Sequence, residues 1–439
     1  MRILFVWPNP PGAGFEYYPG KNQISELMAK ISPLVKPLAF PILAALTPEK
    51  HTVDLIEGRP QDINYNEKYD LVAITSTTRY VNWTYEIADE FRRRGVKVVL
   101  GGWHPSAMPE EAKQHADAVV IGEAEETWPE LLNDLEKGKT KSFYIPNKPV
   151  DTSLIPRPSY KLYPKGTSFT IMATRGCPNG CNFCSITNMK YGNILRKRPI
   201  EEVIKDIKDR PNKIFNFEDN SLTNDPKYSK ELFKAMKGIN KKFFAFANIN
   251  ILGQDDEFLK LACEAGCIGF SVGFESICQQ SIDFMTKPTN KVEKYESAIK
   301  KVHDYGIILI GSFVFGADYD TLEVFNNVDE FVNKHEIDVP DPYVLTPYPG
   351  TPLFEILDKQ DRILTRDWSK YNLERVVFQP KNMTPDELEI NTKLLHDRWY
   401  KYSNIIRRTI KSTRYGFNSF STSLQQNYLS RLNSRFNYD

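Results

Sequence analysis

The sequence predicts an α/β protein with an N-terminal doubly wound, Rossmann-like domain, a full or partial (β/α) barrel and a helical C-terminal extension. Its 439 residues are too many for one ordinary domain. Short apolar runs alternate with helical stretches in two separate series, and each series is typical of a parallel sheet covered by helices. The alternation ends after Pro349, and a long helix is predicted from about Pro385 to Arg408.

The first series predicts a domain over residues 1–136. Its strand candidates are Arg2–Trp7, Thr52–Ile56, Leu71–Thr75, Val96–Leu100 and Ala118–Ile121. Helical stretches such as Thr84–Arg94 lie between them, as in a doubly wound sheet. Residues 137–166 are rich in Lys, Pro, Ser and Tyr without periodicity, which predicts a linker.

The second series predicts a barrel over residues 167–355. Its strand candidates are Ser168–Thr174, Lys213–Phe217, Phe243–Asn248, Gly269–Val272, Ile307–Phe313 and Asp341–Leu345. The helical segments between them include Ile200–Ile207, Asp256–Ala265 and Asn290–His303. About six strand–helix units indicate a full or partial (β/α) barrel. Residues 356–439 then form the helical extension.

The composition limits the cellular setting. Apolar residues make up 41% and charged residues 26%, the balance of a soluble globular protein, and the net charge of +1 argues against a nucleic-acid partner. No run of 18 apolar residues exists, and the first residues, MRILFVWPNP, resemble a strand more than a signal peptide. We therefore expect a cytoplasmic protein. In a reducing compartment, clustered cysteines are better explained as metal ligands than as disulfides.

Three cysteines follow the first predicted barrel strand with the spacing C-x3-C-x2-C: Cys177, Cys181 and Cys184. Three thiolates can bind three irons of a [4Fe–4S] cube and leave the fourth iron open, unlike the four-cysteine arrangement of an electron carrier. An open iron can chelate the amino and carboxyl groups of S-adenosylmethionine (SAM). A zinc site is the alternative, but it needs a fourth ligand, and no nearby Cys or His is obvious.

The chain has three more cysteines: Cys263, Cys267 and Cys278. Cys263 and Cys267 are four residues apart near a predicted helix end, so a second cluster is one alternative. We expect all three to be buried thiols that pack as small apolar residues.

With Phe183 before its last cysteine, this motif resembles that of the radical SAM superfamily. Further segments resemble the family in order: Phe217-Glu218-Asp219-Asn220, Gly273-Phe274-Glu275-Ser276, Gly311–Gly316 with Asp318 and Glu323 after it, and Tyr348–Pro352. The resemblance implies that Glu218 or Asp219 holds the SAM amino group. It also implies that Glu275 and Ser276 lie near the SAM ribose and carboxylate, and that Gly311 to Gly316 contact adenine.

Three loops after the N-terminal strands resemble the cobalamin-binding domain fused to many radical SAM enzymes. They contain Thr75 and Ser76, then Gly101-Gly102-Trp103-His104-Pro105, then Gly122-Glu123-Ala124-Glu125. The loop after the second strand, Ile56–Pro60, lacks the histidine of cobalamin mutases, so no imidazole is expected below cobalt. His104 is another candidate ligand, although a place at a helix start or in a tail-binding loop is favoured. A domain that keeps the fold without cobalamin is the alternative.

The C-terminal extension resembles that of cobalamin-type radical SAM proteins, including hopanoid methylases, at Trp368, Tyr371 and Val376–Pro385. Beyond it the tail is basic and aromatic. Its basic residues are Arg407, Arg408, Lys411, Arg414, Arg431 and Arg435. We favour a solvated, partly disordered tail; contact with an anionic membrane surface is the next alternative, and nucleic-acid binding the third.

The resemblance implies an enzyme that reductively cleaves SAM to a 5′-deoxyadenosyl radical and methylates an unactivated carbon with the help of cobalamin. Cyclisation, carbon–carbon coupling or oxidation by the same cofactors is the alternative, and a non-catalytic cobalamin-binding regulator is the second. A lipid is the first expected substrate, followed by a porphyrin-like molecule or natural product. A reductant such as ferredoxin or flavodoxin is the expected partner.

Overall fold

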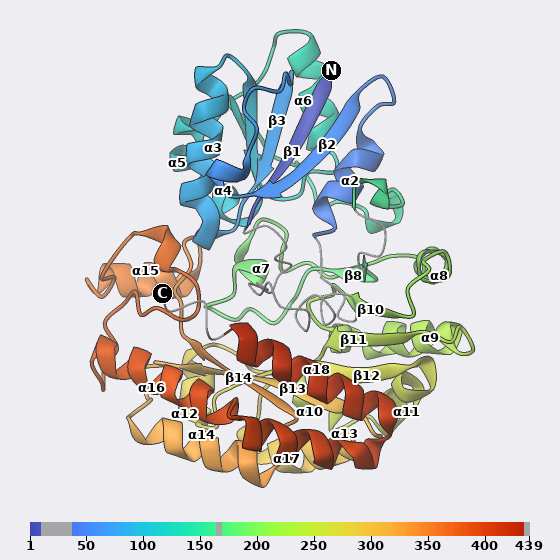
Figure 1. The fold of residues 1–439 in the computed structure, drawn as a ribbon, viewed down its shortest axis with the longest axis vertical. Helices are drawn as coiled ribbons and strands as arrows, with labels where there is room; N and C mark the ends of the chain where they lie inside the picture. The colour runs from blue at the N-terminus through green and yellow to red at the C-terminus, as the bar shows by residue number, and fades with distance from the viewer. Residues whose placement is uncertain (10–36, 164–168, 434–439) are drawn as a thin grey trace.

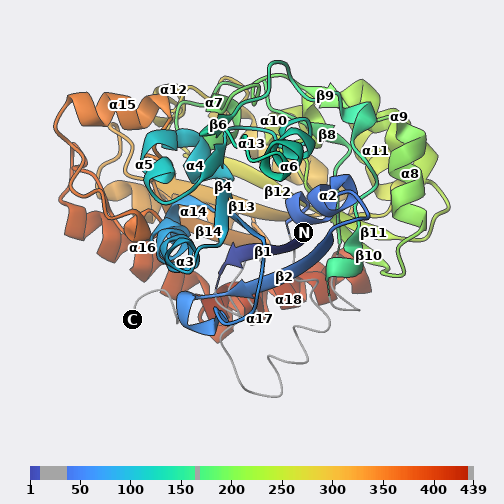
Figure 2. The ribbon, with the colours of Figure 1, turned by 90° about the horizontal axis from the view of Figure 1, so that it is seen from above.

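A computed structural model describes residues 1–9, 37–163 and 169–433 of the protein. An N-terminal domain lies above a larger barrel domain in Figure 1, and the C-terminal helices run along the barrel. Seen from above, the strands of the first domain pass over those of the second (Figure 2). The two predicted domains are therefore stacked on one another.

The N-terminal sheet has six parallel strands in the order β2-β1-β3-β4-β5-β6. They are β1 (Arg2–Pro8), β2 (Thr52–Gly58), β3 (Leu71–Thr75), β4 (Lys97–Gly101), β5 (Ala118–Val120) and β6 (Phe143–Tyr144). The helices are α2 (Ala39–Leu46), α3 (Val81–Arg93), α4 (Trp103–Ala107), α5 (Pro109–Gln114) and α6 (Thr127–Glu136).

Both faces of this sheet are covered, as its apolar strands require. Leu4 and Val6 of β1 pack in one cluster with α3, while Ile3 and Phe5 pack in another with α2 and α6. The doubly wound prediction is thus confirmed. Strand β6 comes from the segment 137–166 that the sequence predicts to be a linker, so part of that segment completes the sheet.

The second sheet has six parallel strands in the order β14-β13-β12-β11-β10-β7. They are β7 (Thr170–Ile171), β10 (Ile214–Phe217), β11 (Lys242–Phe246), β12 (Cys267–Glu275), β13 (Ile308–Phe315) and β14 (Val339–Val344). The main helices are α8 (Ile200–Lys208), α9 (Pro226–Met236), α11 (Asp256–Ala265), α13 (Tyr295–Asp304) and α14 (Glu323–Lys334). Within the described residues β7 and β14 do not pair, so the barrel is partial.

A short hairpin, β8 (Thr174–Arg175) with β9 (Arg196–Lys197), surrounds the cysteine segment and helix α7 (Ser185–Asn188). The remaining short helices are α10 (Ile249–Leu252) and α12 (Gln279–Phe284). Because β7 and β8 lie next to each other in the chain, the hairpin emerges from the carboxyl end of the first barrel strand.

The C-terminal extension contains α15 (Pro352–Lys359), α16 (Pro385–Trp399), α17 (Tyr402–Ser412) and α18 (Phe417–Asn433). The prediction of one helix from Pro385 to Arg408 was wrong, because the chain turns at Tyr400. That side chain is buried, and its hydroxyl donates a hydrogen bond to Pro340 O at 2.7 Å. Its burial against β14 redirects the chain into α17.

The prediction of a disordered tail was also wrong for the described part of it. Helix α18 packs along α17 (Figure 1), and its polar side chains bind the barrel at the starts of two strands. Ser419 Oγ donates to Gly306 O at 3.0 Å, and Asn427 Nδ2 donates to Asp338 O at 2.9 Å. Arg435 lies outside the described residues.

Several basic residues of the tail pair with other groups of the protein, one of them in its interior and two at the surface. Arg408 is buried and donates to Asn427 Oδ1 at 2.7 Å, while Lys411 and Arg414 both pair with Glu336. The predicted membrane contact through these charges therefore gains no support. Among the described residues, no helix is both long and apolar enough to cross a bilayer.

Replacing Asn427 by Ala is expected to destabilise the fold by about 1–3 kcal/mol, because the variant leaves Arg408 and the Asp338 carbonyl without their buried partner. Urea unfolding monitored by circular dichroism measures the loss. The exposed α17 substitution Ser403→Ala is the control and should change little. Equal stability of the two variants would show that α18 does not hold the barrel.

Candidate functional site

A cavity of ≈ 350 Å³ lies between the carboxyl ends of the strands of both sheets. The N-terminal domain lines it with all but one of the residues predicted to bind cobalamin: Thr75, Ser76, Gly101, Gly102, Gly122 and Glu123. The barrel domain contributes Thr174, Arg175, Gly176, Glu218 and Asn220. The cavity therefore joins the two sets of residues that the sequence assigns to separate cofactors.

Two glycines of this cavity, Gly102 and Gly122, are required by the backbone. Gly102 has φ +97°, and a Cβ there would lie 2.6 Å from Thr75 Oγ1. Gly122 has φ +81°, and its N–H donates to Ser106 Oγ at 2.9 Å. The opposite lining is apolar and aromatic, with Trp7, Phe40 and Trp128 among its residues. Glycine loops facing an apolar wall fit the flat corrin of cobalamin.

His104 does not line this cavity. Its imidazole is buried, with Nδ1 3.3 Å from Thr78 Oγ1 and Nε2 3.2 Å from Glu111 Oε1. Trp368 Nε1 donates to the same Glu111 oxygen at 3.0 Å, so this cluster ties the N-terminal domain to the C-terminal extension. Its inclusion among the cofactor-binding residues gains no support, whereas the favoured place at a helix start matches its position as the second residue of α4 (Trp103–Ala107).

The three motif cysteines lie in the segment between β8 and α7, and α7 holds their backbone in place. Thr187 Oγ1 donates to Cys177 O at 2.8 Å, and Asn188 Nδ2 donates to Cys181 O at 2.9 Å and Cys184 O at 2.8 Å. Because these backbone carbonyls already accept hydrogen bonds, the thiols are the groups of the three cysteines that are left to bind a cluster.

The thiols lie near one another. Burial raises the pKa of the Cys181 thiol to about 12, and the charges of Cys184, Glu275 and Cys177 add to this while Lys287 opposes it. Within the described chain, no three His, Cys, Asp or Glu side chains are placed to share one metal ion.

The other cysteines differ from one another. Cys267 is buried, with its Sγ 3.7 Å from Gly269 O, but Cys263 is exposed and Cys278 is half-buried. The expectation that all three are buried was therefore wrong. Cys263 lies near the exposed end of α11, where the helix face turns to solvent.

Asp219 and Glu218, adjacent at the end of β10, have different roles. Asp219 is fully buried and accepts hydrogen bonds from Ala173 N–H at 2.9 Å, Thr174 N–H at 2.5 Å and Thr174 Oγ1 at 2.7 Å. These bonds fix the β7–β8 turn that leads to the cysteines, and Asp219 is not part of the cavity lining. Glu218 and Asn220 do line the cavity.

The Glu218 side chain is exposed to the solvent space of the cavity, although the surrounding protein is dense. Thr170 Oγ1 donates to its Oε2 at 2.9 Å. Burial raises the pKa of the Glu218 carboxyl to about 7, against the lowering effects of Thr170 and Arg175. At neutral pH this group can therefore accept or donate a proton inside the cavity.

Because solvent in the cavity reaches the Glu218 carboxyl and reduces the effect of burial on its pKa, Glu218→Gln is expected to raise the melting temperature of the cofactor-free protein only slightly, in a pH-dependent way. The pKa of Glu218 is higher in the folded protein than in the unfolded chain. Ionised Glu218 therefore lowers the free energy of unfolding above pH 7, and this loss disappears below the unfolded pKa of 4.5. The difference in melting temperature between variant and wild type should thus grow as pH rises from 4.5 to about 7. The exposed substitution Glu355→Gln should show no such trend. A pH-independent difference would contradict the placement of Glu218.

The remaining predicted SAM contacts lie at the ends of β12 and β13. Glu275, at φ 59°, pairs with Lys287 at 2.5 Å, and Ser276 Oγ accepts from Cys278 N–H at 3.0 Å. A Cβ on Gly311 would lie 3.0 Å from Phe274 and Ile337, and one on Gly316 would lie 2.6 Å from Leu388 Cδ2. Packing therefore accounts for both glycines, and neither lines the cavity. Their predicted contact with adenine gains no support.

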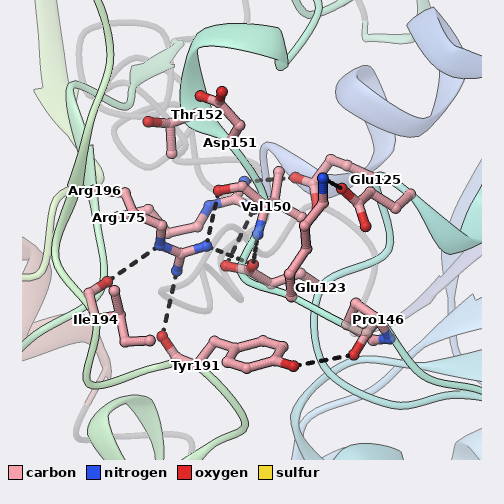
Figure 3. A network of polar contacts seen from close by, with 12 residues as sticks. Glu123, Glu125, Pro146, Val150, Asp151, Thr152, Arg175, Tyr191, Ile194 and Arg196 are labelled. Carbon is pink, nitrogen blue, oxygen red and sulfur yellow. Dashed lines mark hydrogen bonds and ion pairs between the residues drawn. The ribbon is translucent and has the colours of Figure 1, made fainter.

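Sequence reasoning missed Arg175 and Arg196, which line the cavity from β8 and β9. Both point at the Glu123–Glu125 loop of the N-terminal domain (Figure 3). The only signal in the sequence is that Arg175 lies two residues before Cys177.

Comparison with known proteins gives consistent matches. Residues 24–132 match the model of the B12 binding domain, and residues 171–332 match that of the radical SAM superfamily. The chain is 34% identical over 406 residues to the bacteriochlorophyllide d C-12(1)-methyltransferase of Chlorobaculum tepidum, covering 88% of this chain and 87% of that one. The C-8(2)-methyltransferase of the same organism is also 34% identical, over 398 residues, covering 86% and 88%.

Two more distant proteins are similar over most of the chain. The hopanoid C-2 methylase of Rhodopseudomonas palustris is 23% identical over 399 residues, covering 85% of this chain and 73% of that one, which agrees with the predicted resemblance. The solved structure of TsrM from Kitasatospora setae, a radical S-adenosylmethionine methyltransferase with cobalamin and a [4Fe–4S] cluster bound, has a TM-score of 0.71. At 16% identity and 99% coverage of both chains, it shows the same fold.

Proposed function

The chain belongs to the radical SAM superfamily and carries a B12 binding domain, and from this we propose that it is a cobalamin-dependent methyltransferase acting on an unactivated carbon. The observation that carries the proposal is the cavity, which is lined by the glycine loops of one domain and by the segment leading to the cysteines in the other. A regulator that only binds cobalamin needs no open iron site next to its ligand. An enzyme that uses both cofactors on one substrate needs this arrangement.

Different residues bind the two cofactors. Cys177, Cys181 and Cys184 hold the [4Fe–4S] cluster, and the loops at Gly101 and Gly122 hold cobalamin. When bound, the cluster with SAM supplies hydrogen abstraction, and cobalamin supplies the methyl group. The protein positions the reactants and excludes water.

Individual side chains complete the cavity. Asp219 fixes the turn before the cysteines, and Thr187 and Asn188 fix the cysteine loop itself. Glu218 and Asn220 present polar groups to the cavity, where Glu218 can hold or release a proton at its carboxyl oxygen. A low-potential electron donor such as ferredoxin or flavodoxin serves as reductant.

For the substrate, we propose a large apolar ring molecule of the tetrapyrrole class. The two relatives at 34% identity act on bacteriochlorophyllide d by name, whereas the named lipid-modifying relative is 23% identical. This order reverses the sequence-based preference for a lipid.

The substrate proposal is tested with SAM that carries a deuterated methyl group. Anaerobic, fully reconstituted enzyme is incubated with a chlorophyllide-type tetrapyrrole or with a hopanoid lipid, and each product is analysed by mass spectrometry. We expect a deuterated methyl group on the tetrapyrrole only. Label in the hopanoid alone would replace the proposed substrate class, and a dehydrogenated or cyclised product without label would favour the alternative chemistry.

A further inference from the structure

Four charged side chains connect the two domains beside the cavity (Figure 3). Glu123 and Glu125 come from the loop before α6 in the N-terminal domain, and Arg175 and Arg196 come from the β8–β9 hairpin of the barrel domain. Arg175 Nη2 lies 2.6 Å from Glu125 Oε1, and Arg196 Nη1 lies 2.6 Å from Glu123 Oε2. Arg175 Nη1 is also 3.5 Å from Glu123 Oε1, so the pairs form one interdomain charge cluster.

The interdomain charge cluster is largely shielded from solvent. Its side chains are only 11–20% exposed. Burial by itself would raise the pKa of Glu123, but Arg196 and Arg175 outweigh burial and lower it. With two positive and two negative groups the charges balance, and removing one would leave a buried charge without its partner.

Hydrogen bonds to the backbone connect the interdomain charge cluster to segments of both domains. Val150 N–H donates to Glu123 Oε2 at 3.0 Å, and Arg196 Nη1 donates to Val150 O at 3.2 Å. Arg196 Nε also donates to Ile194 O at 3.2 Å, within the segment that closes the cysteine loop. The carboxylate of Glu123 thus binds both the segment at Val150, which follows the N-terminal domain, and the barrel hairpin through Arg196.

On the barrel side, the hairpin is tightly joined to the cysteine loop. Cys177 N–H donates to Gly192 O at 2.8 Å. A Cβ on Gly176 would lie 2.1 Å from Ile194 O, and one on Gly192 would lie 1.8 Å from Ile186 O. Such close backbone packing leaves little freedom, so a displacement of Arg175 must carry the cysteines with it.

We propose that the interdomain charge cluster positions the cysteine loop relative to the cobalamin loops, and that Glu125 and Arg175 are positioning residues for methyl transfer. The proposal rests on the proposed function for its catalytic consequence. Glu123 follows Gly122 directly and Glu125 lies two residues beyond Glu123, so the same loop lines the cavity and binds the hairpin. Displacements of about 1 Å between reacting groups can slow a reaction by up to ~100-fold.

The test compares Glu125→Gln, Arg175→Gln and the double variant in the reconstituted holoenzyme. Iron and cobalamin contents should equal those of the wild type, while methylated product per SAM cleaved should fall about tenfold in each single variant. The double variant should be no worse than Arg175→Gln alone, because that variant already removes the pairing of Arg175 with Glu125. Lys300→Gln with Asp304→Asn, an exposed pair on α13, is the control and should behave as wild type.

Hydrogen exchange provides a readout that is independent of methylation. Glu125→Gln, a change in the N-terminal domain, should increase amide exchange in the barrel hairpin 174–197, whereas the control pair should not. Exchange confined to the residues around Glu125 would overturn the positioning role even if the enzyme methylates its substrate. If Glu125→Gln speeds exchange in the hairpin but the wild-type enzyme transfers no methyl group, the positioning role of the interdomain charge cluster stands and the proposed function is rejected.

Discussion

The triple variant Cys177→Ala, Cys181→Ala and Cys184→Ala is expected to contain no iron–sulfur cluster and to cleave no SAM. Anaerobically reconstituted wild type should bind about four iron and four sulfide per chain, held by three thiolates. Without those ligands the open iron that chelates SAM does not exist, so the loss should be complete. Iron and sulfide analysis measures the first effect, and chromatography of 5′-deoxyadenosine measures the second.

The exposed cysteine provides the matched control, since Cys263→Ala removes a thiol from outside the loop. This variant should keep the cluster and its activity. A full cluster in the triple variant would show that the ligand assignment is wrong. A second full cluster in the wild type would instead implicate Cys263, Cys267 or Cys278.

The second large effect is expected from Gly101→Leu, which should abolish cobalamin binding without removing the cluster. Gly101 lines the cavity, and a Cβ there would meet only Val120, at 3.7 Å, which is an ordinary contact. A larger side chain can therefore be accommodated at the backbone and would occupy space that the cofactor needs. We expect an affinity loss of at least ~100-fold, the cost of about 3 kcal/mol of steric conflict.

Two further glycine variants separate blocking from misfolding. Gly101→Ala should fold and bind cobalamin with a smaller loss. Gly102→Ala should destabilise the domain itself, because its Cβ would lie 2.6 Å from Thr75 Oγ1 at a φ of +97°. Titration of cobalamin by absorbance, with iron content as the folding check, measures all three. Wild-type affinity in Gly101→Leu would place cobalamin elsewhere.

Local sequence patterns were sufficient to predict much of this protein. The apolar runs around Ile3 and Val72 are buried on both faces, so they indicate a parallel sheet without knowledge of its neighbours. The cysteine motif and the Gly101, Gly102 and Gly122 loops likewise carry their signals within a few residues. The structure places the three glycines, together with Gly176 next to Cys177, in the lining of one cavity.

Features that depend on distant partners could not be predicted. Strand β6 has two residues and is specified by pairing with β5, not by its own pattern. The pattern of the tail is that of a solvated segment, because the group that its polar Asn427 side chain binds, the Asp338 carbonyl, is remote from it in sequence. The glutamate and arginine of the interdomain charge cluster are similarly separated, and only the folded chain places them together.

Adjacent residues of one motif can also have different roles that the sequence does not reveal. Glu218 and Asp219 are both acidic at the end of β10, yet one faces the cavity and the other binds the backbone of the β7–β8 turn. Alternation of side chains along and beyond the strand decides between them. The resemblance treated them as equivalent candidates for the SAM amino group.

The central claim, radical methyl transfer that requires both cofactors, is tested most directly by the products of SAM in one anaerobic reaction with the tetrapyrrole substrate. The account predicts 5′-deoxyadenosine, S-adenosylhomocysteine and methylated product in equal amounts, because one SAM is used for hydrogen abstraction and another for the methyl group. Omission of cobalamin should abolish the methylated product. Formation of 5′-deoxyadenosine and a modified substrate without S-adenosylhomocysteine, or equal methylation in the absence of cobalamin, would contradict the account.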